Sequence, residues 1–284
     1  MGSLPIGPIR PIRPIHPIHP MQRALIFIAI LLVALVAFAQ FLRRTSMFFP
    51  ERYPLGNWDA QRGEDVWITT RDKVRLHGWL YRAADPHAPL LLFFHGNAGN
   101  ITERAPIASG FAQHGISVLL FDWRGYGRSE GEPSESALFD DAEAVYQYAK
   151  SSDVVLYGES LGGPYAASIA KKHGARALIL DSTFPSLAAL GNTLYWPLPI
   201  GATAPFALRT RAWANESHVP TLVLHSRNDD VIPFRLGKTL FDELQVPKQM
   251  LTSDVRGHCA ISFDDPRYFD TVARFVKSAH SPRT

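Results

Sequence analysis

Short apolar runs alternate with segments of helical spacing along most of the chain, and this alternation restricts the fold more than any other feature of the sequence. Two runs, 66–70 and 76–81, alternate between apolar and polar side chains and resemble a hairpin that opens the domain. Strands that alternate with helices form βαβ units, so we expect an α/β domain with a mostly parallel central sheet flanked by helices. The central strands are expected in near-continuous apolar runs, typical of strands covered on both faces, at 90–94, 117–121, 154–157, 177–180 and 221–224, with helices at 103–114, 135–150 and 161–173.

The stretch Gly-Glu-Ser-Leu-Gly-Gly begins at Gly158, directly after an apolar run and before a helical segment. So tight a turn from strand to helix leaves room only for glycine on either side, and it holds Ser160 at a strained apex with its hydroxyl exposed. The amino terminus of the following helix favours negative charge that develops there. The motif G-x-S-x-G in this setting predicts the α/β-hydrolase fold, with Ser160 as nucleophile.

A serine hydroxyl needs a base that takes its proton and an acid that orients the base, and in this fold the acid precedes the base along the chain. Asp229 follows a buried strand and is the preferred acid, while its neighbour Asp230 and the earlier Asp181 are the alternatives. The predicted base is His258, which lies on a loop after the short run 249–251.

A glycine-rich loop with the sequence His-Gly-Asn-Ala-Gly-Asn follows the apolar run 90–94. This fold places its second oxyanion donor there, so the backbone N–H groups of Asn97 and Leu161 are predicted to stabilise a tetrahedral intermediate. Such chemistry requires no metal ion and no organic cofactor, and we expect none.

The amino-terminal part of the chain differs from the rest. Prolines at every third position from 5 to 20 are incompatible with an α-helix and predict a disordered leader over 1–23. Residues 24–42 carry no charge and are long enough to cross about 30 Å of hydrocarbon. The apolar run continues past a possible cleavage site at Ala39 and is closed by Arg43 and Arg44, so a retained single-pass membrane helix is favoured over a cleaved signal peptide.

The remaining boundaries follow from these segments: 43–64 is interpreted as a linker and 65–284 as the catalytic domain. Residues 184–217 contain four prolines and many aromatic side chains, and they are predicted to form a short cap insertion over the sheet edge. An apolar lining beside the nucleophile would bind an acyl chain. We predict that Tyr195, Trp196 and Phe206 contribute to this lining, although ordinary packing within the cap is the alternative for such side chains.

Charge and cysteine content exclude other classes of protein. The net charge is only +3, and the basic residues are scattered among 26 acidic ones, so nucleic-acid binding is not expected. The single cysteine, Cys259, excludes an intramolecular disulfide. It adjoins the predicted base and is expected to be a partly buried thiol, not a second nucleophile.

Several motifs occur together in this order: an apolar amino-terminal helix, F-F-P-E-R, H-G-N-A-G-N, D-W-R-G-Y-G-R-S-E-G-E-P-S-E, G-E-S-L-G-G, D-S-T-F, N-D-D-V-I-P and G-H. Together they resemble the Bem46 branch of membrane-associated α/β-hydrolases, which is similar to mammalian ABHD13- and ABHD17-type proteins. The resemblance implies a triad of Ser160, Asp229 and His258 and a structural role for the turn 122–129. The chain departs from the family at Ser226, where a glycine is usual.

The sequence thus predicts a serine hydrolase that cleaves lipid-like acyl esters or thioesters through an acyl-enzyme on Ser160. One alternative is a peptidase of the same fold, which usually carries a propeller or a large cap that this chain has no room for. The other is a non-catalytic scaffold tethered to the membrane, which would be expected to have lost a member of the triad.

Overall fold

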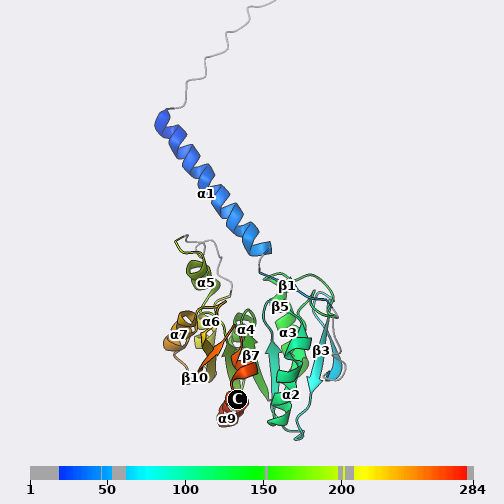
Figure 1. Cartoon of the computed structure of the whole chain (residues 1–284). Coiled ribbons are helices and arrows are strands. Elements are labelled where there is room, and N and C mark those ends of the chain that lie inside the picture. Colours follow the sequence, from blue (N-terminus) through cyan, green and yellow to red (C-terminus); the bar gives the residue numbers. More distant parts are fainter. Residues whose placement is uncertain are drawn as a thin grey trace, which may run out of the picture. The chain divides into compact units, whose positions relative to one another are not determined.

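The computed structural model describes residues 19–45, 47–52, 62–150, 153–197, 201 and 208–279, and the chain divides into two units, 1–41 and 42–284 (Figure 1). The first unit contains most of the helix α1 (Pro20–Thr45). Its segment Pro20–Phe38 has a mean hydropathy of 2.4 and is long and apolar enough to cross a membrane, a property that a membrane anchor and a signal sequence share. The helix begins inside the predicted leader because proline is well tolerated in a first turn, where its missing N–H has no partner in any case. The rest of the leader, 1–18, lies outside the described residues.

The second unit is built around an eight-stranded sheet with the order β10-β9-β8-β7-β4-β6-β3-β2. The two strands of this sheet that come first along the chain, β2 and β3, form an antiparallel hairpin, and the other six strands run parallel to one another. The expected α/β class and mostly parallel sheet are therefore confirmed. The strands are β2 (Glu64–Thr69), β3 (Arg75–Tyr81), β4 (Leu90–Phe94), β6 (Ser117–Phe121), β7 (Val154–Glu159), β8 (Ala177–Asp181), β9 (Thr221–Asn228) and β10 (Lys248–Arg256), and a separate parallel pair joins β1 (Phe49–Pro50) to β5 (Ala98–Gly99).

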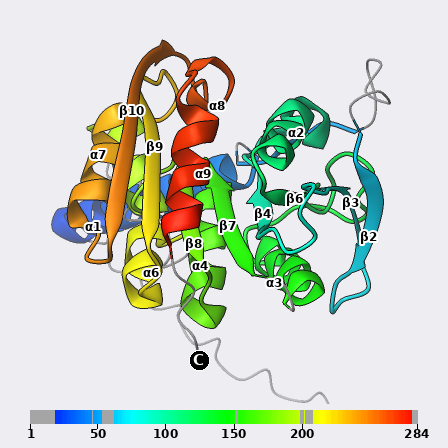
Figure 2. The same cartoon turned by 90° about the horizontal axis from the view of Figure 1, so that it is seen from below.

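Helices cover both faces of the sheet, as Figure 2 shows, with α3, α4 and α6 on one side and α2 on the other. The apolar side chains form two clusters, of which one includes buried residues of α3, α4, α6 and α7 and the other includes those of α2, α8 and α9. The helices are the 3-10 helix η2 (Ile101–Arg104), α2 (Ala105–Gln113), α3 (Ala137–Ala149), α4 (Gly162–His173), α5 (Leu187–Leu194), α6 (Thr210–Ser217), α7 (Phe234–Glu243), α8 (Ile261–Asp264) and α9 (Tyr268–Ser278).

The strand β4 explains why the central runs are apolar without interruption. All five of its side chains are buried. Leu92 and Phe94 belong to one cluster, whereas Leu91 and Phe93 belong to the other. Because successive side chains of a strand point to opposite faces, a strand covered on both faces has to be apolar at every position.

The last strand is the main departure from the predicted elements. The sequence predicts only a short run at 249–251, whereas β10 extends over nine residues. It lies at the edge of the sheet and most of its side chains are half-buried or exposed. Polar residues are therefore tolerated along it, and the apolar signal is short. Since β7, β8, β9 and β10 are parallel, their carboxyl ends meet at one edge of the sheet, where sites in this class of sheet are found.

The segment 184–217 forms two helices of different character. No residue of α5 is fully buried, whereas α6 contacts α4 and buries Thr210 and Ala214. The second helix is thus part of the layer that covers the sheet. Of the residues between the two helices, 198–200 and 202–207 lie outside the described part of the chain.

Gly174, the C-cap of α4, offers a test of the backbone. It has φ of 71° and ψ of 177°, a region that is essentially restricted to glycine. An added Cβ would meet nothing within 4 Å, so Gly174→Ala is expected to lower the free energy of unfolding by about 1–3 kcal/mol through backbone strain alone. Urea-induced unfolding measures this change against Lys171→Ala on the exposed last turn of the same helix. A loss no larger than that of Lys171→Ala would show that the backbone adapts.

Candidate active site

Ser160 lies between the end of β7 and the start of α4 with φ of 50°, the left-handed region that residues other than glycine rarely adopt. Two hydrogen bonds hold the turn in this conformation. The N–H of Ser160 donates to the carbonyl of Asp181 (2.8 Å), and Thr183 Oγ1 donates to the carbonyl of Ser160 (2.7 Å). The serine is only 7% exposed as a residue, and its hydroxyl faces a histidine.

The glycines beside Ser160 are required by close backbone approach. A Cβ on Gly158 would lie 2.5 Å from Cα of Gly163, and a Cβ on Gly162 would lie 1.9 Å from the carbonyl oxygen of Phe94. Both distances are far below any real van der Waals contact. The first turn of α4 therefore packs directly on the end of β4, and only the G-x-S-x-G pattern allows it.

The structure brings the three predicted residues Ser160, His258 and Asp229 into one hydrogen-bonded chain. His258 Nε2 lies 2.9 Å from Ser160 Oγ, and His258 Nδ1 lies 2.8 Å from Asp229 Oδ2. The other carboxylate oxygen, Oδ1, accepts the N–H groups of Val231 (2.9 Å) and Ile232 (2.8 Å). These two bonds fix the carboxylate, so that Oδ2 is directed at the imidazole.

Opposing effects act on the protonation of His258. Burial by itself lowers the pKa of the imidazole. The hydrogen bond that His258 donates to Asp229 and the negative charge of Asp229, together with the charges of Glu159 and Asp181, outweigh burial and raise the pKa of His258 above its usual value of 6.5. A base tuned in this way holds a proton more firmly than free histidine does.

The two alternative acids have other surroundings. The carboxylate of Asp181 is fully buried, and it accepts hydrogen bonds from Tyr157 (2.5 Å) and Ser182 (3.0 Å). Burial raises the pKa of Asp181 to about 7. Asp230 is exposed to solvent. Within the described part of the chain, Asp229 is the acid that is hydrogen-bonded to His258.

The two residues predicted as oxyanion donors lie near Ser160, Leu161 as the next residue in the chain and Asn97 in a loop that comes close to it. A Cβ on Gly96 would lie 3.4 Å from Ser160 Cβ, so the loop that carries Asn97 runs beside the serine. Leu161 is the N-cap of α4 and is 6% exposed. N–H groups at the start of a helix have no partner within the helix, so the Leu161 N–H is available to a ligand at this position.

A buried ion pair beneath the site was not found from the sequence. Arg104 Nη2 lies 2.8 Å from Glu159 Oε1, which also accepts the N–H of Gly96 (3.1 Å). Burial alone would raise the pKa of Glu159, but the Arg104 guanidinium outweighs it and holds this pKa below its usual value. The available signal was an acidic residue that ends a buried strand, since such a charge is costly unless it is paired.

The remaining predicted residues are less closely tied to the site. Tyr195 and Trp196 follow α5 and are 43% and 82% exposed, respectively. Phe206 lies outside the described residues. Their part in substrate binding therefore remains a prediction. Cys259 is 7% exposed, and burial raises the pKa of its thiol well above the usual value, which keeps it protonated. No group of three His, Cys, Asp or Glu side chains suited to a metal ion occurs among the described residues.

Comparison with known proteins gives three kinds of likeness. Residues 85–197 match the family described as serine aminopeptidase, S33. The Mycobacterium tuberculosis protein MT2364 is 34% identical over 244 residues, which cover 82% of this chain and 87% of that protein. Protein bem46 of Schizosaccharomyces pombe is 30% identical over 213 residues, which cover 66% of this chain and 70% of that protein. The Pyrococcus furiosus esterase Pf2001 aligns with a TM-score of 0.65 at 21% identity, covering 82% of this chain and 98% of that one, and this likeness shows the fold alone.

The sheet order, the turn at Ser160 and these likenesses agree with the resemblance that the sequence motifs indicate. The fold is that of the α/β-hydrolases, and the chain belongs to the Bem46-like family of these proteins.

Proposed function

We propose that this protein is a serine hydrolase that cleaves lipid-like carboxylic esters or thioesters through an acyl-enzyme on Ser160. One observation carries the proposal: a continuous hydrogen-bonded chain leads from Asp229 through His258 to the hydroxyl of Ser160. The strained turn beneath the serine supports it, because such a turn costs about 1–3 kcal/mol and is retained where function requires it.

The first half of the reaction transfers the acyl group to the enzyme. Ser160 Oγ attacks the carbonyl carbon while His258 Nε2 takes its proton, and Asp229 stabilises the imidazolium that forms. The N–H groups of Asn97 and Leu161 donate to the carbonyl oxygen as it becomes negative. When the tetrahedral intermediate collapses, the bond to the leaving alkoxide or thiolate breaks and His258 donates the proton to it. Water activated by His258 then attacks the acyl-enzyme, and the acid and the free serine are released.

The serine aminopeptidase family matched by residues 85–197 favours a second candidate, cleavage of an amino-terminal peptide bond. The same catalytic chain would serve both reactions, and the difference lies in the leaving group. An aminoacyl p-nitroanilide assayed beside p-nitrophenyl esters distinguishes them, because a peptidase turns over both and an esterase turns over only the esters.

Removal of the nucleophile or the base is expected to abolish activity. Ser160→Ala and His258→Ala should each lower p-nitrophenyl ester turnover by about 10⁴-fold or more, because members of a catalytic unit act together. Fluorophosphonate labelling should be lost, while the circular dichroism spectrum is unchanged. Ser109→Ala on α2 and the exposed His87→Ala are the matched controls. If Ser160→Ala keeps its turnover, the serine has been wrongly assigned.

The acid is tested by comparing three isosteric substitutions. Asp229→Asn should lower kcat by about 10⁴-fold because the amide stabilises the wrong tautomer of His258. Asp230→Asn and Asp181→Asn should lose far less. For the native enzyme, kcat/KM should rise with pH through a pKa above 6.5, since only the neutral imidazole accepts the proton of the serine. Equal losses at Asp229 and Asp181 would leave the acid unassigned.

The helix α1 is proposed as a retained single-pass anchor. The full-length protein should sediment with membranes and resist carbonate extraction, because the apolar helix is stable only in lipid. A shortened chain that begins at Thr45 should stay in the supernatant. Amino-terminal sequencing of the mature protein provides the opposing result, since a chain that begins at Gln40 would mean a cleaved signal.

The acyl group is tested by chain length. If Tyr195, Trp196 and Phe206 line an acyl site, kcat/KM should rise from acetyl toward longer esters by up to about fourfold per methylene, the equivalent of roughly 0.8 kcal/mol. Trp196→Ala should weaken this dependence more than it weakens acetyl-ester turnover. Tyr148→Ala, also an exposed aromatic residue, is the control. A preference for acetyl esters that Trp196→Ala leaves unchanged would exclude the acyl site but not the hydrolase.

A further inference from the structure

The segment Met47–Arg52, which contains the F-F-P-E-R motif, pairs with the loop that carries the predicted oxyanion donor; we call it the N-terminal strap. Its strand β1 runs parallel to β5 within that loop. The N–H of Phe49 donates to the carbonyl of Asn97 (2.8 Å), and the N–H of Glu51 donates to the carbonyl of Gly99 (3.3 Å). The strap and the loop thus pair side by side through backbone hydrogen bonds.

The proline of the motif fits this ladder. In a strand, successive N–H groups point to opposite sides, so Phe49 and Glu51 face β5 and the residue between them faces away. Pro50 occupies that position, where its missing N–H removes no bond to β5. The sequence F-P-E is therefore compatible with one-sided pairing and hinders pairing on the other side.

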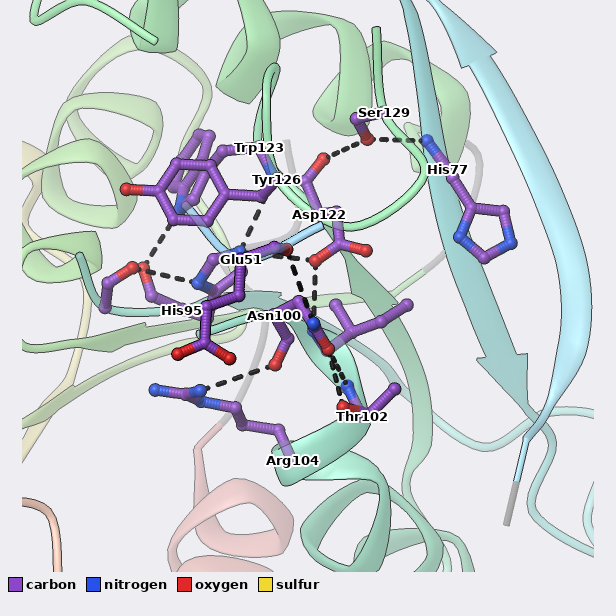
Figure 3. A network of polar contacts seen from close by, with 12 residues as sticks. Glu51, His77, His95, Asn100, Thr102, Arg104, Asp122, Trp123, Tyr126 and Ser129 are labelled. Carbon is purple, nitrogen blue, oxygen red and sulfur yellow. Dashed lines mark hydrogen bonds and ion pairs between the residues drawn. The ribbon is translucent and has the colours of Figure 1, made fainter. Parts of the chain in front are cut away.

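The strap is also attached to the turn that follows β6. The carbonyl of Glu51 accepts the N–H of Gly127 (2.9 Å) and the side-chain amide of Asn100 (3.4 Å). Arg52 Nη1 donates to the carbonyl of Ser129 (2.9 Å). Figure 3 draws Glu51 and Asn100 in this network and labels Tyr126 and Ser129 of the turn as well. Contacts on both sides hold the strap in one position.

The carbonyl of Asn97 is where the strap acts on the candidate site. It accepts two hydrogen bonds, one from Phe49 N–H and one from the hydroxyl of Tyr126 (2.7 Å). On the other side of Asn97, the N–H of Gly96 is held by Glu159. The peptide group that contains the Asn97 N–H therefore lies between two peptide groups that hydrogen bonds hold in place. Glu159 holds the preceding group, and Phe49 of the strap and Tyr126 hold the following one.

We propose that the N-terminal strap is a positioning element of the oxyanion hole, because the backbone N–H of Phe49 holds the carbonyl of Asn97 and so limits movement of the neighbouring Asn97 N–H. The inference rests on the proposed hydrolase function. Oxyanion donors act only when they lie about 2.7–3.1 Å from the oxygen that becomes negative, so a small shift of the loop lowers the rate of reaction and not the binding of substrate. The strap, which follows α1 in the chain, is then part of the catalytic machinery as well as the link between α1 and the catalytic domain.

The decisive variant removes one N–H group. Phe49→Pro deletes the donor to Asn97, whereas Phe49→Ala removes the half-exposed ring but keeps the N–H and is the reference. Both are made in the full-length protein, and kcat is divided by the number of sites that a fluorophosphonate labels at completion. We expect kcat of Phe49→Pro to be about 10-fold below that of Phe49→Ala with KM unchanged, a fraction of the loss seen when a whole donor is removed.

An oxyanion-dependent inhibitor separates positioning from stability. An alkyl trifluoromethyl ketone forms a hemiketal with Ser160 whose oxygen occupies the oxyanion hole, so its Ki should rise by the same factor as kcat falls. Tyr126→Phe removes the second bond to the same carbonyl, and its effect should be non-additive with that of Phe49→Pro. If Phe49→Pro does not fold, Arg52→Ala, which loosens the strap at an exposed position, takes its place. The expected result is again a lower kcat and a higher Ki with KM unchanged.

Three outcomes have different meanings. A fall in kcat per site with a matching rise in Ki supports the inference. Normal kcat and Ki per labelled site, with or without a lower melting temperature, overturn it, because the strap then serves stability alone. If the native protein turns over no ester, or Ser160→Ala keeps the turnover, the proposed function itself fails and the inference fails with it.

Discussion

The contact between the first turn of α4 and the end of β4 governs the whole site. A Cβ on Gly162 would lie 1.9 Å from the carbonyl oxygen of Phe94, so the two backbones touch with no side chain between them. At this contact Ser160 has a left-handed backbone and the glycine-rich loop after β4 lies alongside the serine. Because β9 and β10 end at the same edge of the sheet, Asp229 meets His258 there and His258 in turn contacts the hydroxyl of Ser160.

Charge under the site is arranged so that each buried carboxylate has its own partner. Asp229 accepts two backbone N–H groups and the imidazole of His258, while Glu159 is paired with Arg104. Asp181 takes a third course, with hydroxyl partners and a pKa raised to about 7 by burial. In an interior of low dielectric constant an unpaired charge is costly. The separation of partners leaves one carboxylate to orient the histidine, and this is why Asp229 is the strongest candidate for the acid of the proposed triad.

The chain around the site is held by backbone bonds from distant segments. The Asn97 carbonyl receives donors from the N-terminal strap and from Tyr126, and Gly96 is held by Glu159. Several of the motifs that mark the Bem46-like family lie in these segments, including F-F-P-E-R and D-W-R-G-Y-G-R-S. Both motifs donate hydrogen bonds to the glycine-rich loop, which has few side chains of its own with which to hold its shape.

The sequence by itself determined the α/β class, the central strands, the strained serine turn and the three candidate residues Ser160, Asp229 and His258 that the fold brings together. It could do so because a strand buried on both faces is apolar at every position and because a tight turn admits only glycine beside the serine. The edge strand β10 was predicted too short, since its half-exposed side chains carry a weak apolar signal. Only the tertiary structure revealed the pairing of Arg104 with Glu159 and the pairing of Phe49 with Asn97. Both interactions join segments far apart in the chain, and the second is made by backbone atoms that every residue except proline possesses, so no residue type identifies it.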